Sequence, residues 1–98
     1  MPRNKIPRQL AFNPSVYYFK PQGVPLRLLD EVVISADELE ALKLYEVDEL
    51  SQIAAAKKMM VSQPTFARIL NQANKKIAKA LIWGKAIRIE EETQTVEK

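Results

Sequence analysis

The feature that most constrains the fold is a proline inside an otherwise helical pattern. Apolar residues recur every three or four positions beyond Ile53, yet Pro64 lacks the backbone N–H that a helix interior uses. Ser62 is a favourable N-cap residue, and proline is tolerated in a first turn, where N–H groups have no partner within the helix. The sequence therefore predicts two helices, at about 52–59 and 63–82, joined by a short turn.

The longer of these helices is expected to bury one face. The apolar residues that define this face are Phe66, Ile69, Leu70, Ala73, Ile77, Ala80 and Leu81. Gly84 is expected to end the helix, because glycine readily takes the left-handed conformation that follows a helix. In the shorter helix Ser51 is the cap, and the residues expected to face inward are Ile53, Ala55, Ala56 and Met59.

A third helix is predicted ahead of these two, at about 36–47. Ser35 and Glu38 have the spacing of a capping box, in which each residue bonds to the backbone N–H of the other. The residues expected to face inward are Leu39, Leu42 and Val47.

Short β-strands are expected near 31–34 and 86–90, and a pairing between them is our working hypothesis. The segment 15–20 is another candidate strand, because valine, tyrosine and phenylalanine suit a pleated surface. The fold class is therefore mainly α, with two helices on either side of a short turn, an irregular N-terminal arm and short strands.

A chain of 98 residues is long enough for one domain with a modest core. We divide it into a basic, proline-rich N-terminal segment (1–29), a helix-turn-helix domain (30–90) and an acidic tail (91–98) that we expect to be disordered.

The helix pair around the proline has the residue pattern of a helix-turn-helix. Ala56 supplies the small residue where the helices cross, Met60 occupies the turn and Val61 anchors it. Phe66 and Ile69 are the inward anchors of the second helix. Glycine would fit the position of Met60 more easily, because this turn requires a positive φ.

The stretch "ISADELEALKLYEVDELSQIAAAKKMMVSQPTFARILNQANKKIAKAL" resembles region 4 of bacterial sigma factors, which reads a promoter element. Nearly the whole chain is more similar to the prokaryotic family of predicted DNA-binding proteins called domain of unknown function 134, through "FKPQGVPL", "DELEALKL", "VSQPTFARIL" and "GKAIRIE". This resemblance implies a helix-turn-helix fold that binds DNA. In that family glycine usually stands at the position of Met60, and glutamine at that of Pro64.

Charge is unevenly distributed along the chain, whose formal net charge is +3. Residues 51–88 contain lysine and arginine but no acidic residue, whereas most of the acids lie in 30–50. Segregation of this kind favours a surface that meets a polyanion, and a solvated basic face is the alternative.

The polar face of the helix at 63–82 supplies the candidate DNA contacts. The first two or three turns of a recognition helix enter the major groove, so the candidates for base reading are Gln63, Ala67, Arg68, Asn71 and Gln72. Arg68 suits guanine, and Asn71 or Gln72 suits adenine. The candidates for the DNA backbone are Lys57, Lys58, Ser62, Thr65, Lys75 and Lys79. For the lysines, solubility alone is the alternative role.

Other residues have two interpretations each. The basic residues of the N-terminal segment, Arg3, Lys5 and Arg8, form either an arm along the DNA or a frayed terminus. The aromatic residues Tyr17, Tyr18 and Phe19 are core or dimer contacts rather than stacking platforms. Trp83 covers the end of its helix or lies at a subunit interface.

The predicted function is sequence-specific binding of double-stranded DNA, as a transcriptional regulator. A homodimer is expected because one recognition helix reads few base pairs. The alternative is a sigma-like protein-interaction module that contacts RNA polymerase or another transcription factor through the acidic segment 30–50. RNA binding has less support, since no RNA-recognition signature is present.

Catalysis and membrane insertion are not expected. The chain has no cysteine and no histidine, and glycine occurs only at Gly23 and Gly84, so thiol chemistry, the usual zinc sites and a glycine-rich phosphate loop are excluded. We expect no cofactor. No run approaches the roughly 18 apolar residues of a membrane helix, and the N-terminus lacks the apolar region of a secretory signal. We therefore expect a cytoplasmic protein.

Overall fold

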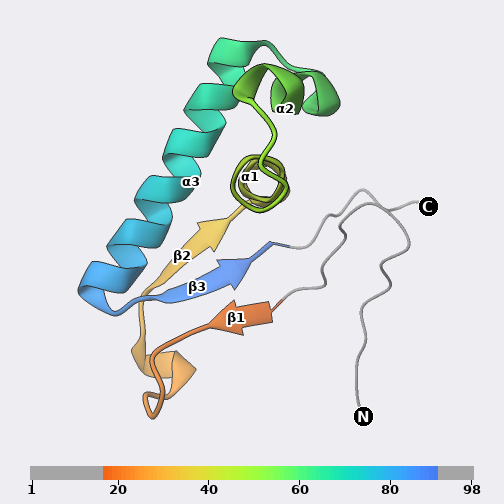
Figure 1. Cartoon of the computed structure of the whole chain (residues 1–98). Coiled ribbons are helices and arrows are strands. Elements are labelled where there is room, and N and C mark those ends of the chain that lie inside the picture. Colours follow the sequence, from red (N-terminus) through yellow and green to blue (C-terminus); the bar gives the residue numbers. More distant parts are fainter. Residues whose placement is uncertain (1–16, 91–98) are drawn as a thin grey trace, which may run out of the picture.

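The computed structural model describes residues 17–90, in which one long helix lies beside a small sheet and two shorter helices (Figure 1). The expectations for the basic arm and the acidic tail fall outside these residues. The helices are α1 (Ala36–Leu42), α2 (Gln52–Met59) and α3 (Gln63–Trp83). The strands are β1 (Tyr17–Phe19), β2 (Glu31–Ile34) and β3 (Ala86–Ile89), and a single 3-10 turn spans Leu26–Leu28. The described fold is mostly helical, which confirms the mainly α prediction at this level.

The sheet has the order β1-β3-β2, so β3 is its central strand. β3 pairs in parallel with β2, where Val32 lies opposite Ile87, and this confirms the pairing expected of 31–34 and 86–90. It pairs in antiparallel fashion with β1, where Phe19 lies opposite Ile87. A parallel pair requires a crossover connection, and here the whole helical segment supplies it.

All three helices begin at the serines predicted from the sequence. The side chains of Ser35, Ser51 and Ser62 accept bonds from the backbone N–H three residues later. The capping box is complete, because Glu38 Oε1 also accepts from the N–H of Ser35 at 2.9 Å. The predicted bounds of α2 are confirmed, and α3 extends one residue beyond its predicted end.

The helix predicted at 36–47 is present, but its last five residues form a π-helical turn instead of α-helix. After α1 it continues through Lys43–Val47 as a wide π-helical turn, closed by the bond from Asp48 N–H to the carbonyl of Lys43. Lys43 Nζ also pairs with Asp48 Oδ2 at 2.7 Å. The chain then reverses through Glu49, whose φ is 61°.

The core between the helices is built around Phe66, which is completely buried. The side chains buried with it are Ala41, Leu44, Ala55, Ala56 and Leu70. Tyr45 packs against Phe66 with ring centroids 6.4 Å apart and ring planes tilted by 60°. Small alanines on α1 and α2 let both helices approach α3 closely, and this fixes where the N-terminal half of α3 lies.

The C-terminal half of α3 covers the sheet (Figure 1). Its buried alanines, Ala73 and Ala80, belong to this half, and the buried strand residues are Ile34, Ala86 and Ile89. Gly84 ends the helix in the left-handed conformation, with φ of 67°, as predicted. α3 therefore spans both parts of the fold.

Three residues predicted to face inward are exposed instead. Ile53 is 66% exposed, because Ala55, Ala56 and Met59 form the inward side of α2 and leave Ile53 on the outer side. Leu81 is 75% exposed, because its neighbour Ala80 takes the inward position in the last turn of α3. Val47 is 73% exposed, because the π-helical turn rotates it away from the core.

The turn between α2 and α3 has the geometry expected of it. Met60 has φ of 62° and ψ of 41°, which is the left-handed conformation. Its N–H bonds to the carbonyls of Ala56 and Lys57, and the N–H of Val61 bonds to the carbonyl of Ala56 at 3.0 Å. These bonds satisfy the last carbonyls of α2, an arrangement in which glycine is the usual residue at the position of Met60.

Candidate nucleic-acid interface

The outward face of α3 presents most of the predicted base-reading residues to solvent. Gln63, Arg68, Asn71 and Gln72 are exposed, whereas Ala67 is half-buried. On the opposite side of the same turns Phe66 and Leu70 are buried in the core. Burial of these anchors holds the helix by its apolar face, so the polar face is available to a partner along the first turns.

The first turn of α3 is held by a short chain of hydroxyl groups. Ser62 Oγ accepts from the N–H of Thr65 at 3.2 Å and donates to Thr65 Oγ1 at 2.9 Å. Arg68 Nη2 also donates to Thr65 Oγ1, at 3.4 Å. Both predicted backbone-contact hydroxyls therefore belong to the cap. The proton of Ser62 is used there, whereas Thr65 Oγ1 accepts from both of these neighbours, so neither bond uses its own proton.

A contact from α2 orients the first residue of α3. Gln63 Nε2 donates to Gln52 Oε1 at 2.6 Å. This bond fixes the side-chain amide of Gln63 at the point where the two helices begin, and it leaves the amide oxygen of Gln63 for another donor. Sequence reasoning missed Gln52, because the two residues are eleven positions apart and only the fold brings them together.

The predicted backbone-contact lysines lie on either side of these residues. Lys57 and Lys58 are exposed in the last turn of α2, where their charge complements the helix dipole. Lys75 and Lys79 are exposed farther along α3. None of these four takes part in an ion pair among residues 17–90. Their ammonium groups are thus available to a polyanion.

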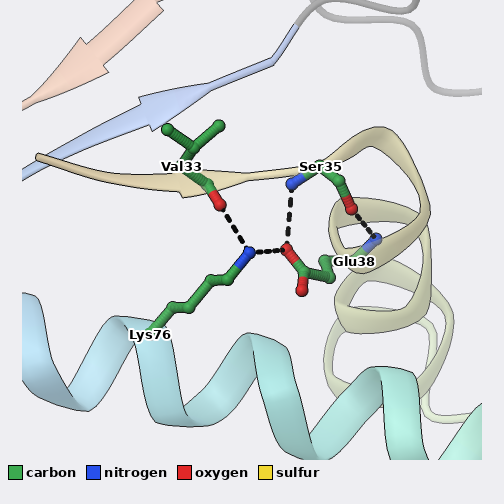
Figure 2. Close-up of polar contacts among 4 residues, drawn as sticks. All are labelled: Val33, Ser35, Glu38 and Lys76. Atoms are coloured by element: carbon green, nitrogen blue, oxygen red, sulfur yellow. Dashed lines mark hydrogen bonds and ion pairs between the residues drawn. The ribbon is translucent and has the colours of Figure 1, made fainter.

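Lys76 has a different environment from its neighbour Lys75. Its Nζ pairs with Glu38 Oε1 at 2.8 Å and donates to the carbonyl oxygen of Val33 at 2.7 Å (Figure 2). Glu38 is only 5% exposed, and the same oxygen accepts from the N–H of Ser35. Figure 2 shows that this cluster ties α3 to the end of β2 and the start of α1. Lys76 therefore positions α3, and its ammonium group is already bonded within the fold.

The same part of the chain was also compared with the requirements of a metal site and of a membrane span. Within the described part of the chain, no group of three or more acidic, cysteine or histidine side chains is placed to hold a metal ion. None of the helices between residues 17 and 90 is long and apolar enough to cross a bilayer.

Comparisons with known proteins identify one family and no assigned activity. The model of the family described as "Protein of unknown function DUF134" matches residues 1–95. A UPF0251 protein of Moorella thermoacetica is 54% identical over 90 residues, which are 92% of this chain and 60% of that protein. A UPF0251 protein of Thermoanaerobacter pseudethanolicus is 49% identical over 90 residues, covering 92% of this chain and 76% of the relative. The chain thus spans less than two thirds of the Moorella protein. No solved structure matches it.

Proposed function

The chain belongs to the family described as "Protein of unknown function DUF134", and from the geometry of α2 and α3 we propose that it binds double-stranded DNA sequence-specifically, as a transcriptional regulator. In this proposal α2, the turn at Met60 and α3 form a helix-turn-helix. The N-terminal half of α3 enters the major groove.

The supporting observation is the outward face of the first turns of α3. It combines an arginine and three side-chain amides, and the sequence from Ser51 to Arg88 contains no acid. An α-helix with its side chains is about 10–12 Å across, and the major groove is about 12 Å wide, so a helix held only by its inner face fits this groove. A solvated helix needs no such segregation of charge.

Each base-reading residue has a distinct chemical role in the proposal. Arg68 donates two bonds to guanine O6 and N7, and Asn71 or Gln72 makes a bidentate contact with adenine. Gln63, oriented by Gln52, offers its amide at the start of the helix. Ala67 and the exposed ring of Pro64 offer apolar contact to a thymine methyl group.

The lysines act on the phosphates in this proposal. Lys57, Lys58, Lys75 and Lys79 neutralise the DNA backbone and fix the register of the helix without reading sequence. The backbone N–H of Gln63 and the hydroxyl of Thr65 add uncharged donors at the positive end of the helix dipole.

The test is selection of bound sequences from random double-stranded DNA, followed by titration of the selected site and a scrambled site. Arg68→Ala should weaken binding to the selected site by about 1–3 kcal/mol and leave the scrambled site nearly unchanged. Lys75→Ala is the matched control, because it should weaken both sites equally. Equal loss on both sites with Arg68→Ala would refute its role as a base reader, and failure to enrich any sequence would refute the function.

A second function is favoured by a different surface. Val47 is 73% exposed and is flanked by the exposed acids Glu46, Asp48 and Glu49. An apolar side chain within an acidic rim suits a basic protein partner, such as RNA polymerase or another transcription factor. On this alternative a gel shift on genomic fragments with competitor DNA shows no selective retention, and Val47→Asp abolishes capture of the partner.

A further inference from the structure

The end of α3 that lies away from α2 forms a groove with β1 and the turn after it. The groove has a volume of about 260 Å³ and is lined mainly by apolar side chains, including Phe19, Pro21, Leu81 and Ile87. Two of these are well exposed, Phe19 by 57% and Leu81 by 75%. Lys20 lies in the wall, where its ammonium group donates to the carbonyl of Val24 at 2.7 Å. This bond holds the wall of the groove in shape.

Large apolar side chains project from the same end of the molecule. Trp83 is 63% exposed and Ile82 is 76% exposed. The ammonium group of Lys85 lies 5.4 Å from the centre of the Trp83 ring, and Lys85 also lines the groove. The indole therefore stands directly beside the groove, so a projection and a recess are neighbours on one surface.

We propose that this end of the molecule is the interface of a two-fold homodimer, in which Trp83 of each copy packs into the groove of the other. A two-fold interface requires one self-complementary surface, and a recess beside a matching projection meets that requirement. The groove is smaller than the roughly 300 Å³ at which pockets for drug-sized ligands begin, so it suits a single large side chain.

The area of this surface fits a second copy. Phe19, Leu81, Ile82 and Trp83 together expose on the order of 500 Å² of side chain, a size at which patches mark interaction sites. A stable interface buries about 800 Å² on each partner, so these four side chains alone supply more than half of the required area.

Lys85 lines the groove, and an acidic residue lies close to it in the fold. The carbonyl of Asp30 accepts from the N–H of Ala86 at 2.9 Å, so Asp30 lies next to Lys85 in the fold. Neither Asp30 nor Lys85 forms an ion pair within the described residues. Two-fold packing allows Lys85 of one copy to meet Asp30 of the other, and the two charges then attract each other.

The dimer would also set the distance between the two α3 helices that we propose to enter DNA. This part of the inference rests on that proposed function. α3 has 21 residues and is therefore about 30 Å long. Helices joined near their C-terminal ends place their N-terminal ends as much as about 60 Å apart, and an inclined pair reaches major grooves one turn, about 34 Å, apart. The selected DNA site should then be a palindrome.

The test is sedimentation equilibrium of the whole chain without DNA. The wild-type protein should dimerise, and Leu81→Glu and Trp83→Glu should each weaken the dimer at least about tenfold. Val47→Glu is the matched control, because Val47 is about as exposed as Leu81 but lies in the π-helical turn after α1 and does not line the groove, so it should dimerise like the wild type. Circular dichroism verifies that each variant is folded.

Each result decides one claim. A wild-type protein that stays monomeric at high micromolar concentration, or Leu81→Glu and Trp83→Glu variants that still dimerise like the wild type, overturns the interface. Dimerisation without selective DNA binding refutes the proposed function and leaves the interface standing. A monomeric Leu81→Glu variant that still binds a single half-site supports both.

Discussion

Met60 shows how one residue can occupy a conformation that its side chain does not favour. A left-handed residue with a Cβ loses roughly 1 kcal/mol or more relative to glycine, because the Cβ approaches the following carbonyl. Met60 has φ of 62° and is 89% exposed, so its side chain recovers little by packing. This strain lies in the turn between α2 and α3, the two helices that we propose to contact DNA.

Met60→Gly should stabilise the fold. The substitution relieves the left-handed strain, and the greater freedom of glycine in the unfolded chain offsets part of the gain, so we expect an increase of about 0.5–1 kcal/mol in the free energy of unfolding. Urea denaturation measures it. Lys58→Gly, two residues earlier in the helical conformation, is the control and should destabilise by about 0.5–1 kcal/mol. A loss of stability in both would show that the methionine side chain contributes packing.

Lys76 and Lys75 are adjacent lysines with different expected effects on stability. Lys76→Met removes the charge partner of Glu38, whose side chain is 6% exposed, and should reduce the free energy of unfolding by roughly 1–3 kcal/mol. Lys75→Met should change it by less than about 0.5 kcal/mol, because Lys75 is exposed and makes no ion pair within residues 17–90. Thermal unfolding of the two variants checks this. Equal effects would mean that the cluster in Figure 2 does not hold α3 in place.

At the scale of the elements, the sequence predicted where the helices begin and most of the residues that they bury, including Phe66, Leu70 and Ala73. Ser35, Ser51 and Ser62 act on N–H groups three residues away, so the sequence alone contains the whole interaction. Burial of Ile53 or Leu81 depends instead on which neighbours pack beside them. Their apolar character predicted an inward position, whereas the neighbouring alanines of α2 and α3 take the inward positions instead.

Other features were beyond prediction for the same physical reason. The bond from Gln63 to Gln52 joins two helices, and the antiparallel partner of β1 lies at the other end of the described chain. The π-helical turn at Lys43–Val47 depends on one extra residue within a helix, a change that apolar periodicity does not reveal. The base-reading residues remain a prediction. The structure establishes that all but Ala67 are exposed.

The cap of α3 should matter both for stability and for the proposed binding. Ser62→Ala removes the acceptor of the Thr65 N–H and the hydroxyl that bonds to Thr65 Oγ1, and should reduce the free energy of unfolding by about 1 kcal/mol. Ser51→Ala at the start of α2 is the comparison and should have a similar effect on stability. Selective DNA binding should fall further in Ser62→Ala, because that cap also orders the first turn of α3. If both variants lost DNA binding to a similar extent, the first turn of α3 would have no special role in DNA binding.

For the whole molecule, charge is separated along the sequence and only partly in the fold. Residues 51–88 contain no acid, and most of the acids lie in 30–50. Two ion pairs join these segments, Lys76 with Glu38 and Arg88 with Glu31, and the other basic side chains of 51–88 form no ion pair within the described residues. Long-range steering of DNA would orient the protein before contact.

DNA affinity should fall steeply as the salt concentration rises, and the steepness should depend on the number of lysines that contact phosphates. The slope of log K against log salt concentration should decrease in magnitude by about 1 for Lys57→Ala and again for Lys79→Ala, because each neutralises about one phosphate. Lys76→Ala should leave the slope nearly unchanged, since its ammonium group is already paired with Glu38. Fluorescence titrations at several salt concentrations provide the slopes. An unchanged slope for Lys57→Ala and Lys79→Ala would remove these lysines from the interface.

The pairing of Tyr17 with Ile89 means that the first and last residues of the sheet are neighbours in space. A short glycine-serine linker from residue 90 back to residue 17 would therefore need to span only one strand-to-strand gap. New ends could be opened in the exposed turn at Gly23, where nothing lies within 4 Å of an added Cβ. Such a circular permutant would turn β3 and β1 into a local hairpin. It would keep the order β2, α1, α2, α3 intact, so the unit proposed to meet DNA would stay continuous.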